Sequence, residues 1–140
     1  MKIVLLERNS AGTDISVDCF RELGEVTAYA NTVTEEEVTQ RIGDADIVVC
    51  NKSPMRESTL KDCPNVKLIC ELATGYDNCD LAYCKSRGIQ VRNVVDYSTG
   101  MVAQHTFTLA LALSQKLSHY DQYVKSGAYS SQDRFSNFDI

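Results

Sequence analysis

Short runs of apolar and β-branched residues recur along the first hundred residues and predict five strands. The predicted strands are Lys2 to Leu6, Glu25 to Tyr29, Asp46 to Cys50, Val66 to Cys70 and Ile89 to Asn93. Amphipathic stretches between them predict helices over Thr13 to Leu23, Thr34 to Arg41 and Asn78 to Arg87, with a short helical turn around Arg56 to Lys61. Several strands are almost continuously apolar, as a parallel sheet covered on both faces requires. The pattern therefore predicts an open α/β fold.

Start and stop signals agree with these boundaries. Thr34 precedes three glutamates, and an acidic first turn suits the positive end of a helix dipole. Gly24, Gly43 and Gly88 each stand just before a strand, where a left-handed helix cap favours glycine. Residues 1 to about 95 are thus expected to form a flavodoxin-like doubly wound parallel sheet of about five strands.

A longer helix is predicted after the sheet, with Ser98 or Thr99 as its cap. Apolar and small residues recur along it at helical spacing: Val102, Thr106, Leu109, Leu113 and Leu117. Such a face is expected to pack against a second domain or another subunit. From His119 onward the sequence turns polar and predicts no clear strand. We therefore expect a domain over residues 1–97 and a separate part over 98–140.

Composition and charge indicate a globular domain and disfavour binding to polyanions. The chain has 140 residues, of which 44% are hydrophobic and 24% charged, and its net charge is -5. No cluster of lysine and arginine occurs, so nucleic-acid binding is disfavoured. The apolar run at the N-terminus is too short for a signal peptide or a membrane span. These features predict a cytoplasmic protein without a membrane partner.

Six cysteines occur, but their spacing favours neither disulfides nor a metal site. There is no CxxC motif, and no histidine stands near a pair of cysteines. Most of the cysteines are expected to be buried, reduced thiols, since Cys50 and Cys70 end apolar runs and Cys84 falls on a helical pattern. Cys79 is the candidate for an exposed, oxidisable thiol.

The loops that follow the strands are where a ligand is expected, because open α/β sheets bind ligands at the carboxyl ends of their strands. The loop from Glu71 to Asn78 contains Gly75, and free backbone N–H groups at Thr74 and Gly75 would make a cradle for a carboxylate or a phosphate. Lys52 follows the third strand and would lie on the same rim. A plain turn glycine and a solvated lysine remain the alternative interpretation.

Other catalytic signals are missing from the sequence. His105 lies within the long helix and His119 near its end, and neither has an acidic partner at a spacing that would fix its tautomer. No GxGxxG loop, Walker loop or nucleophile elbow occurs. The residues alone therefore predict no complete active site.

The order of several segments resembles that of the D-2-hydroxyacid dehydrogenases. The segments are Glu71 to Asp80, Gly88 to Asn93, Tyr97 to Thr99 and Val102 to Thr106, which follow the family's glycine loop and its D-N-x-D, G-I-x-V-x-N and V-A-E/Q-H patterns. Within the family, the chain most resembles the glycerate dehydrogenase and hydroxypyruvate reductase branch. Three parts of the sequence carry this resemblance: Val48 to Lys52, Leu72 to Gly75 and Gln104. The resemblance covers essentially the whole chain.

The resemblance implies an NAD- or NADP-dependent oxidoreductase that interconverts a 2-keto acid, similar to hydroxypyruvate, with a D-2-hydroxy acid. It implies that Lys52, Ala73, Thr74 and Gly75 bind the substrate and that Thr74 and Val102 approach the nicotinamide. The helix that starts near Thr99 would form a homodimer. Residues 98–140 would be this linking helix and the start of the nucleotide-binding domain, with 118–140 approaching its first strand.

The family also needs residues that this sequence lacks: the GxGxxG loop, an acidic residue for the ribose, a substrate-orienting arginine and a Glu-His pair. We expect these to follow Ile140 in a longer parent. Hydride transfer requires nicotinamide and substrate held between two domains, so the 140-residue chain alone is expected to be inactive and to carry no cofactor.

Two other classes of function stay open at this point. The same resemblance extends to corepressors that use this fold to bind partners. A free-standing flavodoxin-like module is the second, with Asn9 to Asp14 as a cradle for a flavin phosphate. Its phosphoacceptor version fails, because Cys50 to Lys52 stand where an aspartate is needed.

Overall fold

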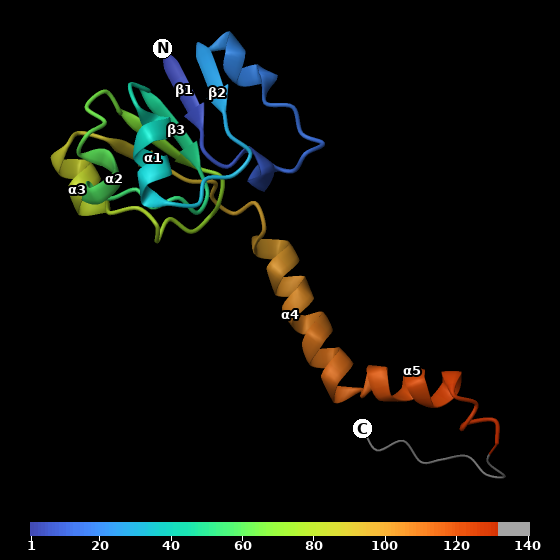
Figure 1. The fold of residues 1–140 in the computed structure, drawn as a ribbon. Helices are drawn as coiled ribbons and strands as arrows, with labels where there is room; N and C mark the ends of the chain where they lie inside the picture. Colours follow the sequence, from blue (N-terminus) through green and yellow to red (C-terminus); the bar gives the residue numbers. More distant parts are fainter. Residues whose placement is uncertain (132–140) are drawn as a thin grey trace. The chain divides into compact units, whose positions relative to one another are not determined.

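The computed structural model describes residues 1–131 and divides the chain into two compact units, Met1–Val95 and Asp96–Ile140 (Figure 1). The first unit holds the sheet and three α-helices, and the second holds the long helix that follows. The predicted approach to a nucleotide-binding strand, over residues 118–140, lies partly outside the described residues.

The first unit is built on a five-stranded, entirely parallel sheet. Its strands are β1 Lys2–Leu5, β2 Glu25–Ala28, β3 Ile47–Cys50, β4 Leu68–Glu71 and β5 Gln90–Arg92. Their order across the sheet is β2-β1-β3-β4-β5, which is the flavodoxin-like order. The structure thus confirms the predicted α/β fold.

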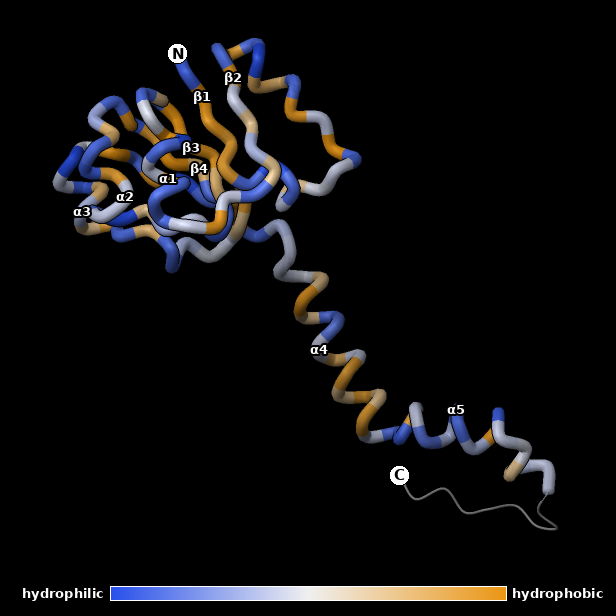
Figure 2. The backbone as a smooth tube through the Cα atoms, viewed as in Figure 1, coloured by the Kyte–Doolittle hydropathy of each residue, from blue (hydrophilic) through white to orange (hydrophobic). Residues whose placement is uncertain are grey.

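Both faces of the sheet carry a core, because successive side chains of a strand point to opposite sides. Val4 and Leu6 belong to the larger core, whereas Ile3 and Leu5 belong to the smaller one. The larger core lies under helices α1 Glu35–Ile42, α2 Glu57–Leu60 and α3 Leu81–Ser86. The strands form the hydrophobic centre of this unit in Figure 2.

The helix expected over Thr13 to Leu23 does not form. A 3-10 helix, η2 Asp18–Glu22, forms within this segment, and another, η1 Arg8–Ala11, precedes it. Small polar side chains explain the difference, because they compete with the helical hydrogen bonds of the backbone. The Ser16 hydroxyl accepts from the Asp18 N–H at 3.1 Å, and its own proton goes to the Asp18 carboxylate at 2.9 Å. The segment still covers the smaller core with Val17 and Phe20.

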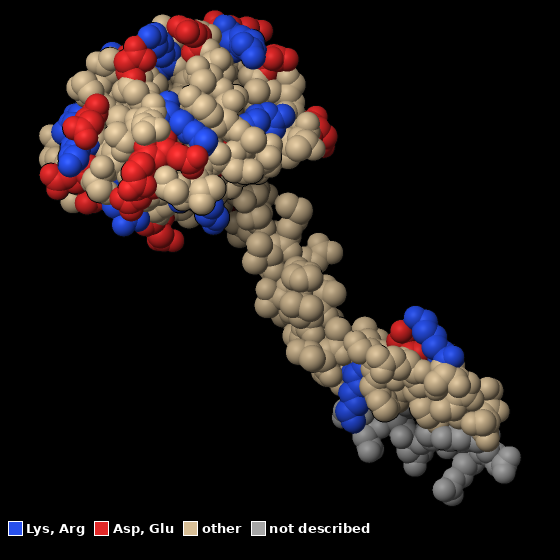
Figure 3. Space-filling model, viewed as in Figure 1, with Lys and Arg blue, Asp and Glu red and all other residues tan. Residues whose placement is uncertain are grey.

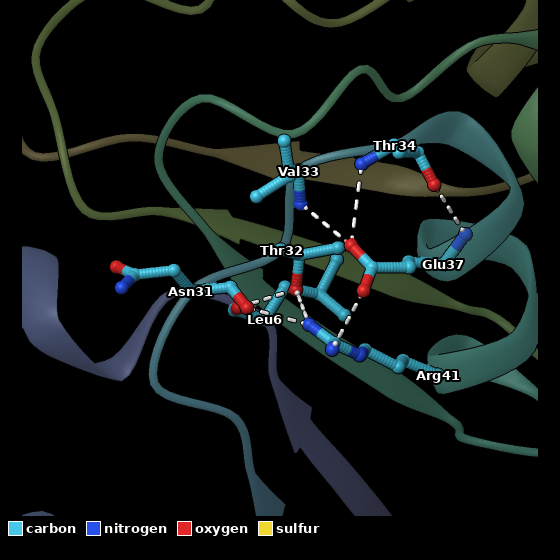
Figure 4. Close-up of polar contacts among 7 residues, drawn as sticks. All are labelled: Leu6, Asn31, Thr32, Val33, Thr34, Glu37 and Arg41. Carbon is cyan, nitrogen blue, oxygen red and sulfur yellow. Dashed lines mark hydrogen bonds and ion pairs between the residues drawn. The ribbon is translucent and has the colours of Figure 1, made fainter.

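Helix α1 begins as predicted, at a complete capping box (Figure 4). Thr34 Oγ1 accepts from the Glu37 N–H at 3.2 Å, and Glu37 Oε2 accepts from the N–H groups of Val33 and Thr34 at 2.9 and 3.3 Å. These backbone bonds lower the pKa of Glu37. Arg41 donates to Glu37 Oε1 at 3.0 Å and to Thr32 Oγ1 at 2.9 Å, so the turn before the helix is tied to its last turn.

Two of the three glycines expected as left-handed caps have a positive φ angle, which favours glycine. Gly43 and Gly88 have φ angles of +49° and +72°. The prediction is wrong for Gly24, whose φ is not positive. Glycine is needed there for another reason, since a Cβ at this position would lie 2.1 Å from the Met1 carbonyl oxygen.

The second unit contains α4 Thr99–Ser114 and α5 Leu117–Lys125. The predicted long helix ends earlier than expected, because Lys116 adopts a left-handed conformation with φ +49° and Leu117 starts a new helix. None of the α4 side chains is buried, and the helix contains no Lys, Arg, Asp or Glu (Figure 3). Among the described residues, no helix is both long enough and apolar enough to cross a membrane.

Candidate functional site

The carboxyl ends of β1, β3 and β4 lead into three loops at one edge of the sheet. A pocket of about 350 Å³ opens between the second and third of these loops. It is lined by Asn51, Lys52, Ala73, Gly75, Asp77 and Asn78. The structure therefore brings Lys52 and the Gly75 loop together, as the sheet topology predicts.

Several amides of the loop after β1 are engaged within the protein. Asn9 donates its N–H to the Ala30 carbonyl at 3.0 Å, Ser10 to Glu7 at 2.9 Å, and Gly12 to Asn9 at 3.2 Å. These bonds close the 3-10 turn and pin it to the end of β2. A phosphate cradle at Asn9 to Asp14, which the flavin alternative requires, would therefore lack the amides of Asn9, Ser10 and Gly12.

The loop after β3 does gather its N–H groups around an anion, but the anion belongs to the protein. Glu7 is only 8% exposed, and its carboxylate accepts from Asn51 at 2.7 Å, from Lys52 at 2.9 and 3.0 Å, and from Ser53 at 3.2 Å. Such bonds to a charged acceptor are stronger than neutral ones. The Lys52 side chain is left for a ligand, and it makes no ion pair within residues 1–131.

The loop after β4 keeps its amides free. The N–H groups of Thr74 and Gly75 donate to no described group. The loop is held instead by the segment after β5: Thr74 Oγ1 donates to the Val94 carbonyl at 3.0 Å, and its carbonyl accepts from Asn93 Nδ2 at 2.7 Å. A third bond joins the Val94 N–H to Ala73 at 3.0 Å. The loop is thus fixed while two of its donors stay available, which suits an anion site.

A buried carboxylate lies behind this loop. Glu71 is 2% exposed, and its Oε1 accepts from Asn78 Nδ2 at 2.8 Å and from the thiols of Cys50 and Cys79 at 3.1 and 3.0 Å. The Asn78 amide also donates to the Ser53 carbonyl at 2.9 Å. Asn78 therefore ties the two pocket loops to each other and to the end of β4.

Cys79 is buried, contrary to the expectation of an exposed, oxidisable thiol. Burial, followed by the nearby Glu71 carboxylate, raises the pKa of the Cys50 and Cys79 thiols well above the ordinary value. Both stay protonated and donate to Glu71. All six cysteines are unpaired, and the described residues form no cluster of three or more metal-binding side chains.

The other residues named from the sequence lie elsewhere. Val102 is 60% exposed on α4 in the second unit, and His105 and His119 lie on α4 and α5. Within the first unit, sequence reasoning missed Glu7 and Glu71. Glu7 could have been found, because a lone acidic residue directly after an apolar strand points into the same edge as the other loops.

The first unit is an open α/β domain of the doubly wound class, with a small pocket at the carboxyl ends of its strands. A sequence model of the D-isomer specific 2-hydroxyacid dehydrogenase catalytic domain matches residues 3–137. The chain belongs to the D-isomer specific 2-hydroxyacid dehydrogenase family.

Individual relatives agree with the branch that the motifs indicate. A hydroxypyruvate reductase from Blautia hydrogenotrophica is 39% identical over 134 residues, which cover 94% of this chain and 42% of that protein. A glycerate dehydrogenase from Methylorubrum extorquens is 38% identical over 138 residues, which cover 99% of this chain and 43% of that protein. The chain thus spans less than half the length of these curated relatives.

Solved structures share the fold. D-lactate dehydrogenase from Aquifex aeolicus, complexed with NAD and lactic acid, is 27% identical with a TM-score of 0.71, over 96% of this chain and 39% of that one. An acyclic imino acid reductase in complex with NADPH and D-Arg is 23% identical with a TM-score of 0.83, over 100% of this chain and 45% of that one. The second likeness concerns the fold alone.

Proposed function

We propose that residues 1–97 form the substrate-binding domain of an NAD(P)-dependent dehydrogenase that interconverts a 2-oxo acid, such as hydroxypyruvate, with its D-2-hydroxy acid. The observation that carries the proposal is the pair of unengaged amides at Thr74 and Gly75, in a loop that lines one pocket with Lys52. A substrate carboxylate would accept from these amides, and the Lys52 ammonium would balance its charge. The names of the curated relatives support this substrate class.

The nicotinamide cofactor of this proposal would supply the hydride. Thr74 is exposed at the pocket loop, which fits a contact with a bound ring, and Val102 is the second residue that we assign to this contact. The engaged amides after β1 (Asn9, Ser10, Gly12) and after β3 (Asn51, Lys52, Ser53) are not available to the dinucleotide phosphates. Residues 98–140 would form the linking helix and the start of the nucleotide-binding domain.

The same proposal includes a homodimer formed through α4. Within residues 96–131, nothing covers the apolar side chains of this helix, among them Phe107 and Leu113 at 72% and 80% exposed. Apolar surface of this kind is typical of an interface. The six unpaired thiols support a reducing, cytoplasmic setting.

Ligand binding can be tested on the 140-residue chain by titrating the ¹⁵N-labelled protein with D-glycerate. We expect the amide signals of Thr74 and Gly75 to shift, because they gain a hydrogen-bonded carboxylate. Lys52→Ala is expected to weaken binding by about tenfold, the effect of one charged hydrogen bond. Lys61→Ala, which removes an exposed lysine at the end of α2, is the matched control. Shifts that avoid residues 73–75 would refute the proposal.

A further inference from the structure

Two side chains of opposite charge line the same pocket, and neither pairs with another group among the described residues. Lys52 and Asp77 both belong to the lining. Within residues 1–131, neither the ammonium nor the carboxylate has a hydrogen bond or an ion pair. Asp77 is also not the N-cap of helix α3, because the Asp80 carboxylate caps that helix by accepting a hydrogen bond from the Tyr83 N–H at 2.9 Å. Both charges are therefore available to a ligand.

The carboxylate of Asp77 lies close to the amides that are proposed to bind the substrate. A Cβ built on Gly75 would lie 3.7 Å from Asp77 Oδ2, which is ordinary contact distance. A ligand whose carboxylate accepts from the Gly75 N–H would thus hold its neighbouring carbon atoms within reach of Asp77. A substituent on that part of the ligand meets an acceptor with negative charge.

The rest of the site adds no second cation. Glu7, behind the Lys52 loop, brings one more negative charge whose bonds to Asn51, Lys52 and Ser53 hold it in place. Arg8 is turned away, because its guanidinium donates to the carbonyls of Gly12 and Ile15. Among the residues that line the pocket, one carboxylate of a ligand can pair with the Lys52 ammonium, whereas a second carboxylate has no further cation and is repelled by Asp77.

We propose that Asp77 is a specificity-determining residue of this pocket. It accepts a hydrogen bond from a hydroxyl on C3 of a three-carbon 2-oxo or 2-hydroxy acid, and it repels a carboxylate on C3. The inference rests on the proposed function and narrows its substrate class to hydroxylated monocarboxylates. A ligand without the C3 hydroxyl still binds through its carboxylate, but more weakly.

Three probes separate these effects in NMR titrations of the 140-residue chain. D-glycerate carries a hydroxyl on C3, D-lactate lacks it, and D-malate carries a carboxylate there. We expect D-glycerate to bind about three- to tenfold more tightly than D-lactate, since one hydrogen bond to an exposed charge is worth that much. D-malate should bind more weakly than either.

Two variants assign the preferences to one side chain. Asp77→Ala should make D-glycerate and D-lactate bind equally. Asp77→Asn, which keeps an acceptor but removes the charge, should raise the affinity for D-malate at least threefold. Asp62→Asn makes the same charge change at an exposed site after α2 and should leave all three affinities in their wild-type ratio.

The outcomes distinguish this inference from the function on which it rests. If the amides of residues 73–75 shift with all three probes but Asp77→Asn and Asp77→Ala leave their ratios unchanged, the pocket binds 2-hydroxy acids and the role of Asp77 is refuted. If no probe shifts these amides in the wild-type chain, the proposed function fails and the specificity of Asp77 fails with it.

Discussion

Replacement of Glu7 by alanine tests whether the protein's own carboxylate organises the Lys52 loop. The side chain holds three backbone N–H groups, those of Asn51, Lys52 and Ser53, from a position that is 8% exposed. Truncation leaves these donors without their charged acceptor. We therefore expect Glu7→Ala to destabilise the first unit and to release the loop.

The magnitude follows from the bonds that are lost. Hydrogen bonds to charged groups contribute about 1.5–3 kcal/mol each, so three of them set an upper limit of about 9 kcal/mol. Water can reach the rim once the side chain is gone, and the unfolded chain hydrates the carboxylate that folding had buried. We expect a loss of about 3 kcal/mol. Glu7→Gln keeps one acceptor oxygen and should lose about half as much.

Urea unfolding followed by circular dichroism measures the loss, and amide hydrogen exchange of residues 51–53 locates it. Glu22→Ala removes an exposed acid from η2, changes the net charge equally and should leave the free energy of unfolding within 0.5 kcal/mol of wild type, about the usual range for surface substitutions. A Glu7→Ala protein as stable as this control, with unchanged exchange at residues 51–53, would show that Glu7 does not hold the loop.

Three further outcomes are expected. Gly24→Ala should cost about 1–3 kcal/mol in thermal or urea unfolding, because its Cβ would meet the Met1 carbonyl oxygen at 2.1 Å; an unchanged stability would contradict this close approach. In a thiol titration of the native protein, exposed Cys19 should react fast and Cys79 only on unfolding, since burial and Glu71 raise the pKa of its thiol. Asp46→Asn should make the free energy of unfolding depend less on pH in the acid range. The Lys2 N–H bond lowers the pKa of Asp46, so its contribution is present above pH 3.8 and is lost as the pH falls further through the lowered pKa; urea midpoints measured across this range check it.

The sheet could be predicted from the sequence because its strands are runs of apolar residues too short for helices. Val48 and Val49 are both buried, one in each core, so no alternation of polar residues is needed. The first crossover could not be predicted in the same way. Its apolar positions, including Val17 and Phe20, suit a helix, but the serine and aspartate beside them satisfy the backbone locally.

The candidate site was only half visible in the sequence. Gly75 and Lys52 could be placed on one rim, since topology brings the ends of β3 and β4 together. Which amides stay free depends on contacts between loops that are distant in the chain. Glu7 accepts from the N–H of Asn51, which is 44 positions away in the chain, and no local sequence pattern predicts such a contact.

The place of β1 in the sheet affects how the protein is made. This strand lies between β2 and β3, yet β3 begins at Ile47, 45 positions after Lys2. At about 5–20 residues per second, a ribosome needs roughly 2 to 9 s to synthesise the residues from β1 to β3. One edge of the apolar strand β1 therefore stays unpaired during that time, and an unpaired strand edge is open to aggregation until β3 has been made.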